Sequence, residues 1–230
     1  DLWQADLKDG RWQDARPLPL NTTGKDFDPM FSADGKWLYF FSDRPGGYGG
    51  DDLYRAEVRA DGSYGPARNL GATVNGAGNE WAPTPGFDGT TLMFSSDRAG
   101  GAGKQDLYVA RWDGRGFAKP QPLPGVNTAS DEFDAAFLDH GRALVYAQSV
   151  DGNAAPIQLF LAECDGKAYV TRGPLPLSFN TDTGYTMSPV PDWSKPKEML
   201  VSGAAPELRM GGRDLYRLAV PATQGKDGCI

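Results

Sequence analysis

The sequence predicts an all-β fold, a β-propeller of four-stranded antiparallel blades, and three observations support that prediction. The first is a Leu-aromatic motif that recurs at intervals of 51, 54, 52 and 56 residues: Asp1-Leu2-Trp3, Asp52-Leu53-Tyr54, Asp106-Leu107-Tyr108, Gln158-Leu159-Phe160 and Asp214-Leu215-Tyr216. The second is a marker asparagine that recurs at intervals of 54, 52 and 53 residues: Asn21, Asn75, Asn127 and Asn180. The third is the composition, since 30 glycines and 18 prolines suit short strands joined by tight turns. A fixed period of this length indicates a solenoid, propeller or array, and four strands per unit is typical of a propeller blade.

The first two units supply the strand pattern. Runs of β-branched and aromatic residues predict strands over 28–32, 37–42, 53–58 and 64–70, and Asp-Gly turns at 34–35 and 61–62 indicate antiparallel hairpins. The second unit repeats the pattern, with strands expected over 81–86, 91–96, 107–112 and 117–123. The third and fourth units fit more loosely. No stretch of 10 residues shows helical periodicity free of glycine and proline, so almost no helix is expected.

The repeat also predicts the domain organisation. We expect a single propeller domain over residues 1–230, with units at approximately 1–51, 52–105, 106–157 and 158–213, a closing strand over 214–220 and a flexible tail over 221–230. The chain holds four inner strand pairs but five strands with the Leu-aromatic motif. If the strand over 12–18 completes the last blade, the ring closes with four blades. If a further inner pair precedes the sequence, there are five blades or more. A β-sandwich is the rival fold, but it would not need such regular units.

Composition and charge exclude several classes of function. A net charge of −7 argues against nucleic acid, which is bound through clustered lysine and arginine. No apolar run approaches the roughly 18 residues that span a bilayer, so no membrane insertion is expected. Cys164 and Cys229 occupy no repeat position, so we expect neither a stabilising disulfide nor a metal site from them. We expect a monomer with no cofactor and no metal.

The repeat motif carries a family resemblance. In the first unit it reads Asp28-Pro29-Met30-Phe31-Ser32-Ala33-Asp34-Gly35, followed by Ser42-Asp43-Arg44. This resembles the P-x-F-S-x-D-G repeat of TolB-like propellers, which occur in bacterial envelope proteins and beside OmpA-like domains. The resemblance is close in the first two units and weakens in the third and fourth. It implies a periplasmic or secreted binding module, without catalytic activity, for a protein or peptide partner.

The residue inventory offers little for catalysis. The single histidine, His140, stands at a turn position, and no G-x-S-x-G elbow exists to hold a nucleophilic serine. A catalytic zinc site usually takes two or three histidines. The glycine-rich segments at 45–50 and 100–104 lack the helix that would bind a phosphate, and we interpret them as wide connections between strands. The enzymatic alternative left open is a glycoside hydrolase.

A set of acidic residues in repeat register provides the candidate ligand site. Five residues after each marker asparagine stand Asp26, Glu80, Glu132 and Tyr185, and Trp81 follows Glu80. These positions enter the innermost strands, so we expect them to surround the mouth of the central channel. Two carboxyls about 5 to 9.5 Å apart would suit a glycosidase. The alternatives are a structural role that arises from copying the repeat, a ligand or cation site, and hydrolysis.

The connections predict which face binds a partner. In an antiparallel blade, the links between blades and the links from second to third strand emerge on one face, and here these are the long links. Binding residues concentrate on long loops of a rigid scaffold. We therefore expect a protein or peptide to bind on this face, through Asp26, Glu80, Trp81, Glu132 and Tyr185. The alternative is a carbohydrate-binding or glycoside-processing propeller.

Overall fold

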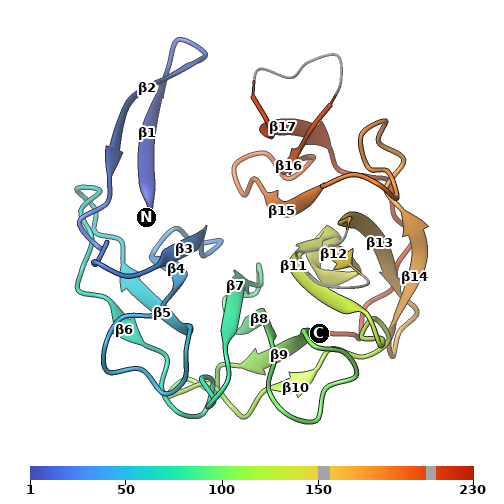
Figure 1. Cartoon of the computed structure of the whole chain (residues 1–230), viewed down its shortest axis with the longest axis horizontal. Helices are drawn as coiled ribbons and strands as arrows, with labels where there is room; N and C mark the ends of the chain where they lie inside the picture. The colour runs from blue at the N-terminus through green and yellow to red at the C-terminus, as the bar shows by residue number, and fades with distance from the viewer. Residues whose placement is uncertain (150–155, 206–210) are drawn as a thin grey trace.

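The computed structural model describes residues 1–149, 156–205 and 211–230. Within these residues the strands form five antiparallel sheets around a central axis (Figure 1). They are β1 (Trp3–Lys8) and β2 (Arg11–Pro17); β3 (Asp26–Phe31), β4 (Trp37–Ser42), β5 (Asp52–Glu57) and β6 (Arg68–Asn69); β7 (Glu80–Pro85), β8 (Thr91–Ser96), β9 (Asp106–Arg111) and β10 (Gln121–Pro122); β11 (Asp131–Leu138), β12 (Ala143–Ser149), β13 (Gln158–Cys164) and β14 (Tyr169–Pro174); and β15 (Met187–Pro191), β16 (Glu198–Gly203) and β17 (Asp214–Ala219). The described ranges contain one helical element, the 3-10 turn η1 (Asp139–Gly141), and no helix with the length and apolar character needed to cross a bilayer.

The sheets are blades of a propeller, as the repeat predicts. Three of them have four strands, in chain order from the axis outward, and the fourth has three, β15-β16-β17. The inner strands meet in sequence around the axis, because β3 contacts β7, β7 contacts β11 and β11 contacts β15. The predicted all-β propeller is therefore confirmed, with four blades and a separate two-stranded hairpin, β1–β2.

The ring does not close in the way that the four-blade alternative required. In that alternative the strand over 12–18 completed the last blade. Instead β2 pairs with β1, from Trp3↔Pro17 to Lys8↔Arg11, and β17 pairs with β16. The hairpin occupies the place of the two outer strands of a further blade, between the sheets β3–β6 and β15–β17 (Figure 1).

The second strands of the first two blades match their predicted bounds better than the outermost strands do. β4 and β8 have the predicted limits, whereas β6 and β10 are two residues long where seven-residue strands were expected. Proline explains the difference, since Pro66 interrupts the first of these segments, and Pro120 precedes β10 and Pro122 ends it. Proline has no N–H to donate to a strand ladder and is confined to sheet edges.

The marker asparagines connect each unit to the one before it. The Asn75 side chain accepts a hydrogen bond from the Leu53 N–H at 2.9 Å and donates one to the Leu53 carbonyl at 3.1 Å. The same pair of bonds recurs between asparagine and leucine in three other places: Asn21 with Leu2, Asn127 with Leu107, and Asn180 with Leu159. These asparagine latches give the leucine N–H at the start of the third strand its partner, and they add a second hydrogen bond to the leucine carbonyl, which also accepts from the backbone, as Leu53 does from the Leu70 N–H at 3.0 Å.

The long connections share one face, as expected, and their glycines are required there by close packing. The link between β4 and β5 contacts the link between β6 and β7, with the Gly50 N–H donating to the Gly78 carbonyl at 3.0 Å. A Cβ added to Gly49 would lie 2.0 Å from that carbonyl oxygen. The Asp52 carboxylate accepts hydrogen bonds from the Tyr48 and Gly49 N–H groups at 2.7 and 3.1 Å. Asp106 holds the link between β8 and β9 in the same way.

The prediction that the cysteines stay unpaired is wrong. Cys164 and Cys229 form a disulfide 65 residues apart in sequence. After β17 the chain returns to the third blade, where the Lys226 N–H donates to the Cys164 carbonyl and Ile230 packs against the blade's core. Sequence spacing could not reveal this return, because the tail lies outside the repeat. The flexibility of residues 221–230 stays a prediction.

Candidate binding site in the axial channel

The three acids predicted at the channel mouth are structural partners of their own loops. Asp26, Glu80 and Glu132 each have an exposed fraction of 0%. Each carboxylate accepts a hydrogen bond from the backbone N–H four residues earlier, from Thr22, Gly76 and Thr128 at 2.6, 2.9 and 2.8 Å. The carboxylates therefore stabilise the turns that lead into β3, β7 and β11 rather than lining the channel.

In the first two blades an arginine completes the arrangement. The Arg44 guanidinium donates to Asp26, and the Arg98 guanidinium donates to Glu80 at 2.9 Å. Arg98 also lies over the Phe94 and Tyr108 rings, at 5.0 and 4.8 Å from their centroids. The sequence analysis did not identify the inner acids as partners of these arginines. The available signal was the constant separation of 18 residues between acid and arginine.

The partners determine how each carboxyl titrates. Burial raises the pKa of Glu80, against the opposing effects of the Gly76 N–H and Arg98. Burial also raises the pKa of Glu132, whose partners are Thr128 and the neutral amide of Gln148. For Asp26 burial acts in the same direction, but hydrogen bonds from Thr22 and Arg44 outweigh it and lower the pKa.

The fourth unit is shifted by one residue relative to the expected register. The inner-strand ladder slips between Trp81 and Thr84 in the second blade and between Met187 and Val190 in the fourth. Thr186, and not Tyr185, therefore occupies the place of Glu80, and the Thr186 hydroxyl donates to the Phe179 carbonyl at 2.9 Å. The link before β15 is one residue longer than its counterparts, which counting from the marker asparagine could not show.

The structure separates the two predicted aromatic residues. Trp81 is half-buried, its indole N–H donates to Asp51 at 2.7 Å, and its ring lines a chamber of the axial channel. Tyr185 is half-buried beside an open hollow of about 580 Å³, where the Arg213 guanidinium lies 5.4 Å from its ring centroid. Of the five predicted site residues, Trp81 is the one that lines the axial channel.

The channel itself is lined by a bulge that recurs in every inner strand. The ladder slips at the same place in β3, β7, β11 and β15. The residues at the bulges adopt a left-handed backbone conformation: Asp28, Ala82, Asp134 and Ser188, with φ of 51°, 47°, 43° and 53°. Non-glycine residues seldom adopt positive φ, and bulges commonly redirect side chains near functional sites. Two of the four positions carry a carboxyl.

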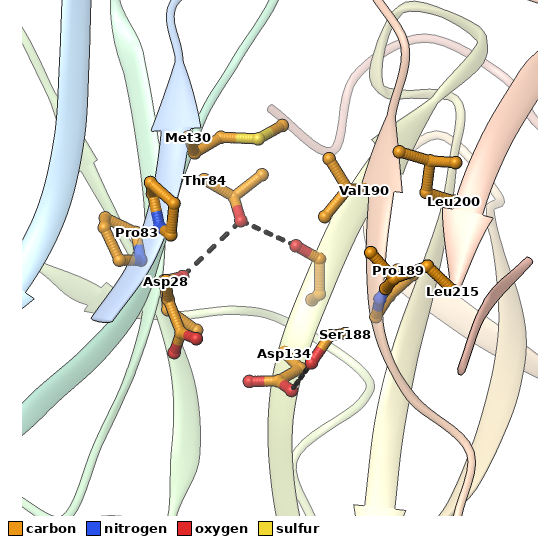
Figure 2. Close-up of a pocket in the computed structure, with 13 residues that line it drawn as sticks. Asp28, Met30, Pro83, Thr84, Asp134, Ser188, Pro189, Val190, Leu200 and Leu215 are labelled. Atoms are coloured by element: carbon orange, nitrogen blue, oxygen red, sulfur yellow. Dashed lines mark hydrogen bonds between the residues drawn. The ribbon is translucent and has the colours of Figure 1, made fainter. Parts of the chain in front are cut away.

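These bulges line two cavities beside the axis, of which Figure 2 shows the larger. One chamber, of about 360 Å³, places the carboxyls of Asp28 and Asp134 near an apolar wall that includes Met30, Val190 and Leu200. A second chamber, of about 230 Å³, has both carboxyls in its lining together with Trp81. The acidic pair therefore lies between two chambers and faces both.

Both axial carboxyls have a raised pKa, which favours their protonated form. Enclosure by the channel wall, and then the nearby Asp134 carboxylate, raise the pKa of Asp28. Enclosure also raises the pKa of Asp134, although the Ser188 hydroxyl donates to it at 2.9 Å. The Asp28 side chain is nevertheless accessible within the channel. A cation between the two would remove their mutual repulsion.

Among the described residues, the side chains that commonly bind metals form no cluster of three, and the single histidine packs in a turn. In residues 1–149, 156–205 and 211–230, no three His, Cys, Asp or Glu side chains are placed to hold a metal ion. His140 lies in η1 with a φ of 58°, and its ring packs edge-on against Phe87 with centroids 4.4 Å apart. The prediction that this histidine occupies a turn with unusual φ is confirmed.

Known structures share this fold at low sequence identity. A putative TolB from Agrobacterium tumefaciens is 13% identical, with a TM-score of 0.55 over 92% of this chain and 72% of that one. TolB from Acinetobacter baumannii is 16% identical, with a TM-score of 0.50 over 97% of this chain and 49% of that one. A structure from a study of two prolyl endopeptidases is 15% identical, with a TM-score of 0.53 over 91% of this chain and 27% of that one. No protein-family model and no curated protein matches the sequence.

The likeness to TolB propellers is thus a shared fold, as the repeat motif predicted. The chain spans about half the length of the Acinetobacter protein and about a quarter of the endopeptidase. The same architecture occurs in TolB structures and in a structure from a study of prolyl endopeptidases, and a fold shared at this level does not transfer an activity.

Proposed function

We propose that this chain is a non-catalytic binding module for a protein or peptide of the bacterial cell envelope, in the periplasm or outside the cell. In this proposal the partner inserts a basic or amphipathic group into the axial channel. The observation that carries it is the larger chamber, about 360 Å³, in which Asp28 and Asp134 stand near an apolar wall. A lysine or arginine side chain has the matching chemistry, because its head group pairs with carboxylates and its aliphatic stem packs on apolar surface.

The predicted site residues divide into two roles under this proposal. Trp81 and Tyr185 remain partly accessible and contact the partner at the long-loop face. Asp26, Glu80 and Glu132 are buried, so they support the inner strands and contact no partner directly. Binding is preferred to catalysis because the single histidine, His140, packs against Phe87 in η1, while the channel hydroxyls of Ser95 and Ser188 donate to the Trp81 carbonyl and the Asp134 carboxylate.

A carbohydrate ligand is the second candidate. It is favoured by two carboxyls facing one cavity and by the raised pKa of Asp28, which would suit a general acid. Trp81, in the adjoining chamber, offers an aromatic surface on which a sugar ring could stack.

The test compares partner capture with glycan binding. The protein is immobilised, exposed to bacterial envelope extract, and in parallel applied to a glycan array. The proposal expects a protein partner whose binding weakens with added salt and weakens about tenfold in the variant Asp28→Asn/Asp134→Asn. The matched control is Asp34→Asn/Asp88→Asn, which alters two acids in the tight turns on the opposite face. Binding of glycans alone supports the second candidate, and partner binding unchanged in the channel variant contradicts the proposed site.

A further inference from the structure

The repeat provides an internal standard for which residue normally stands at each position of a blade. On the third strand of the first blade, Arg55 lies opposite Tyr39. The equivalent positions in the second and third blades hold Val109 and Leu161. Val109 packs against a core that the second and third blades share, and Leu161 against one that the third and fourth share. Arg55 therefore places a positive charge where the repeat elsewhere places an apolar side chain between two blades.

The two indole rings beside Arg55 also depart from the repeat. The guanidinium carbon of Arg55 lies 4.2 Å from the Trp37 ring centroid and 4.7 Å from that of Trp112. Trp37 begins β4 of the first blade, and Trp112 directly follows β9 of the second. No counterpart of either tryptophan is aromatic: Thr91, Ala143 and Glu198 for Trp37, and Val58, Cys164 and Val220 for Trp112. Three exceptions to the repeat thus meet at one place.

This place is a hollow of about 160 Å³ between the first two blades, lined by Arg55 and both tryptophans. The lining also includes Asp34 and Gly89, exposed residues of two tight turns, so the hollow lies on the face opposite the long connections. It is separate from the two axial chambers and has room for one amino-acid side chain.

The charge of Arg55 has no counter-ion in the part of the chain that the structure describes. The two nearby acids pair with other cations, Asp34 with Lys36 at 3.2 Å and Asp88 with Arg111 at 3.4 Å. The aromatic faces hold the guanidinium by cation–π attraction and leave its N–H groups without a carboxylate. A guanidinium presents these donors as a planar fork that matches a carboxylate.

The other polar groups of the hollow are already used. The Ser32 hydroxyl donates to Asp34 and the Thr91 hydroxyl donates to Asp88, both at 2.7 Å. Few groups remain to bond the hydroxyls of a sugar, and a phosphate is usually bound by a cluster of arginines. One guanidinium among aromatic rings suits a carboxylate on a short apolar stem.

We propose that this hollow binds a carboxylate of a peptide, either an acidic side chain or the chain terminus. Arg55 pairs with the carboxylate through two parallel hydrogen bonds, while Trp37 and Trp112 orient the guanidinium and pack on the stem of the ligand. The site is independent of the proposed function, since it lies on the other face and takes a ligand group of opposite charge.

The test follows the indole N–H signals of Trp37 and Trp112 by NMR in the ¹⁵N-labelled protein. Three probes are titrated: N-acetylglutamate α-methylamide, which carries a side-chain carboxylate, N-acetylalanine, which carries a terminal one, and glucuronate. At least one of the two peptide probes should shift both signals saturably, and the stronger of the two identifies the source. Arg55→Leu introduces the residue type of the third blade, so it should fold, and it should weaken binding about tenfold or more.

The fourth blade supplies the matched control. Arg217 occupies the register position of Arg55 but pairs with Asp192 at 2.6 Å and Glu198 at 2.9 Å. Arg217→Leu should leave binding unchanged. Asp28→Asn/Asp134→Asn should also leave it unchanged, which distinguishes this inference from the proposed function. The neutral N-acetylalanine methylamide should not bind.

The inference is overturned if neither peptide probe shifts the indole signals, if Arg55→Leu binds as the native protein does, or if glucuronate alone binds. Should circular dichroism show that Arg55→Leu is unfolded, Arg55→Lys replaces it. An ammonium keeps the charge but cannot form the paired hydrogen bonds, so this variant should bind about fivefold more weakly. Affinity equal to that of the native protein would then exclude the proposed pairing.

Discussion

The first two blades and the last two hold their inner strands in place by different means. In the first two, an arginine spans the long-loop face to pair with a buried acid, Asp26 or Glu80. In the third blade the neutral amide of Gln148 bonds Glu132, and in the fourth Thr186 replaces the acid altogether. The backbone bulges remain the same in all four. The comparison shows that one strand geometry is supported by charged, neutral or hydroxyl partners, so the acids in repeat register are parts of the scaffold.

Loss of the disulfide is expected to have the largest effect on the free energy of unfolding, and the disulfide involves the third blade alone. Cys164→Ser/Cys229→Ser removes a link that closes a loop of 65 residues, and we expect a loss of about 4 kcal/mol in the free energy of unfolding on the chain-entropy model. For a chain of this size, that corresponds to a fall in melting temperature of about 10 °C. Scanning calorimetry measures it. Reductant should lower the melting temperature of the native protein and leave that of the double variant unchanged.

The arginine–acid pair of the second blade should contribute more to the free energy of unfolding than the neutral hydrogen bond of the third blade does. Arg98→Ala leaves the fully buried Glu80 carboxylate without its charged partner, and we expect a loss of about 3 kcal/mol. Gln148→Ala removes one neutral hydrogen bond from Glu132 and should cost about 1 kcal/mol. Urea unfolding at pH 7 compares the two variants. Equal losses would refute the distinction drawn between the halves.

The pH dependence of the Arg98→Ala variant tests the cause of its loss. Burial already raises the pKa of Glu80, and loss of Arg98 raises it further. As the pH falls, Glu80 therefore binds a proton in the folded variant before it does so in the unfolded chain, which stabilises the folded variant. The deficit of Arg98→Ala relative to the native protein should therefore shrink as the pH falls toward 4.5. A deficit independent of pH between 7 and about 5 would indicate lost packing instead.

The asparagine latches should contribute equally to stability in the two halves. Asn75→Ala and Asn180→Ala each leave a buried leucine N–H and carbonyl without a side-chain partner, and we expect each change to cost about 2 kcal/mol. Asn21→Ala should cost less, because its site is only partly buried and water can replace the amide. Thermal unfolding of the three variants measures the order, and a loss confined to Asn75→Ala would show that the latch is not a general device.

The smallest expected effect is a gain in stability and not a loss. The folded pKa of Asp28 is raised above its unfolded value of about 3.8. The folded state then binds more protons than the unfolded one across the interval above 3.8, so the contribution of this carboxyl to stability is lost as the pH rises through that interval. Asp28→Asn should be more stable than the native protein at pH 8, with the difference vanishing near pH 4. The gain should stay below about 1 kcal/mol because the side chain is accessible to water.

The sequence predicted the blades well and the site partly. The run Trp37-Leu38-Tyr39-Phe40-Phe41-Ser42 gave the bounds of β4, because an unbroken apolar run between turn signals reports a buried strand directly. The position of Glu80 was also predicted, but its burial was not, since the covering arginine comes from a loop 18 residues away. Repeat register shows which residues are equivalent and does not show which way they point.

The axial pair was the harder part to predict. Asp28 opens the repeat motif of the first unit, but its place in the channel depends on a bulge that turns it toward the axis. Asp28, Ala82 and Ser188 each precede a proline, but that position favours extended backbone and not the positive φ observed, so the prolines did not predict the bulge. The disulfide could not be predicted, because the tail that carries Cys229 returns to the third blade by a path outside the repeat.

The asparagine latches also set the order in which parts of a blade can be completed during synthesis. Each latch reaches backward, from an asparagine to a leucine 19 to 22 residues earlier in the chain. The leucine N–H at the start of the third strand of a blade therefore lacks its partner until the asparagine of the following link has been synthesised. Translation at about 5–20 residues per second makes this delay about 1 to 4 seconds per blade. The nascent protein thus always carries one unfinished blade behind its growing end, and that blade is the part of the molecule exposed to chaperones and proteases.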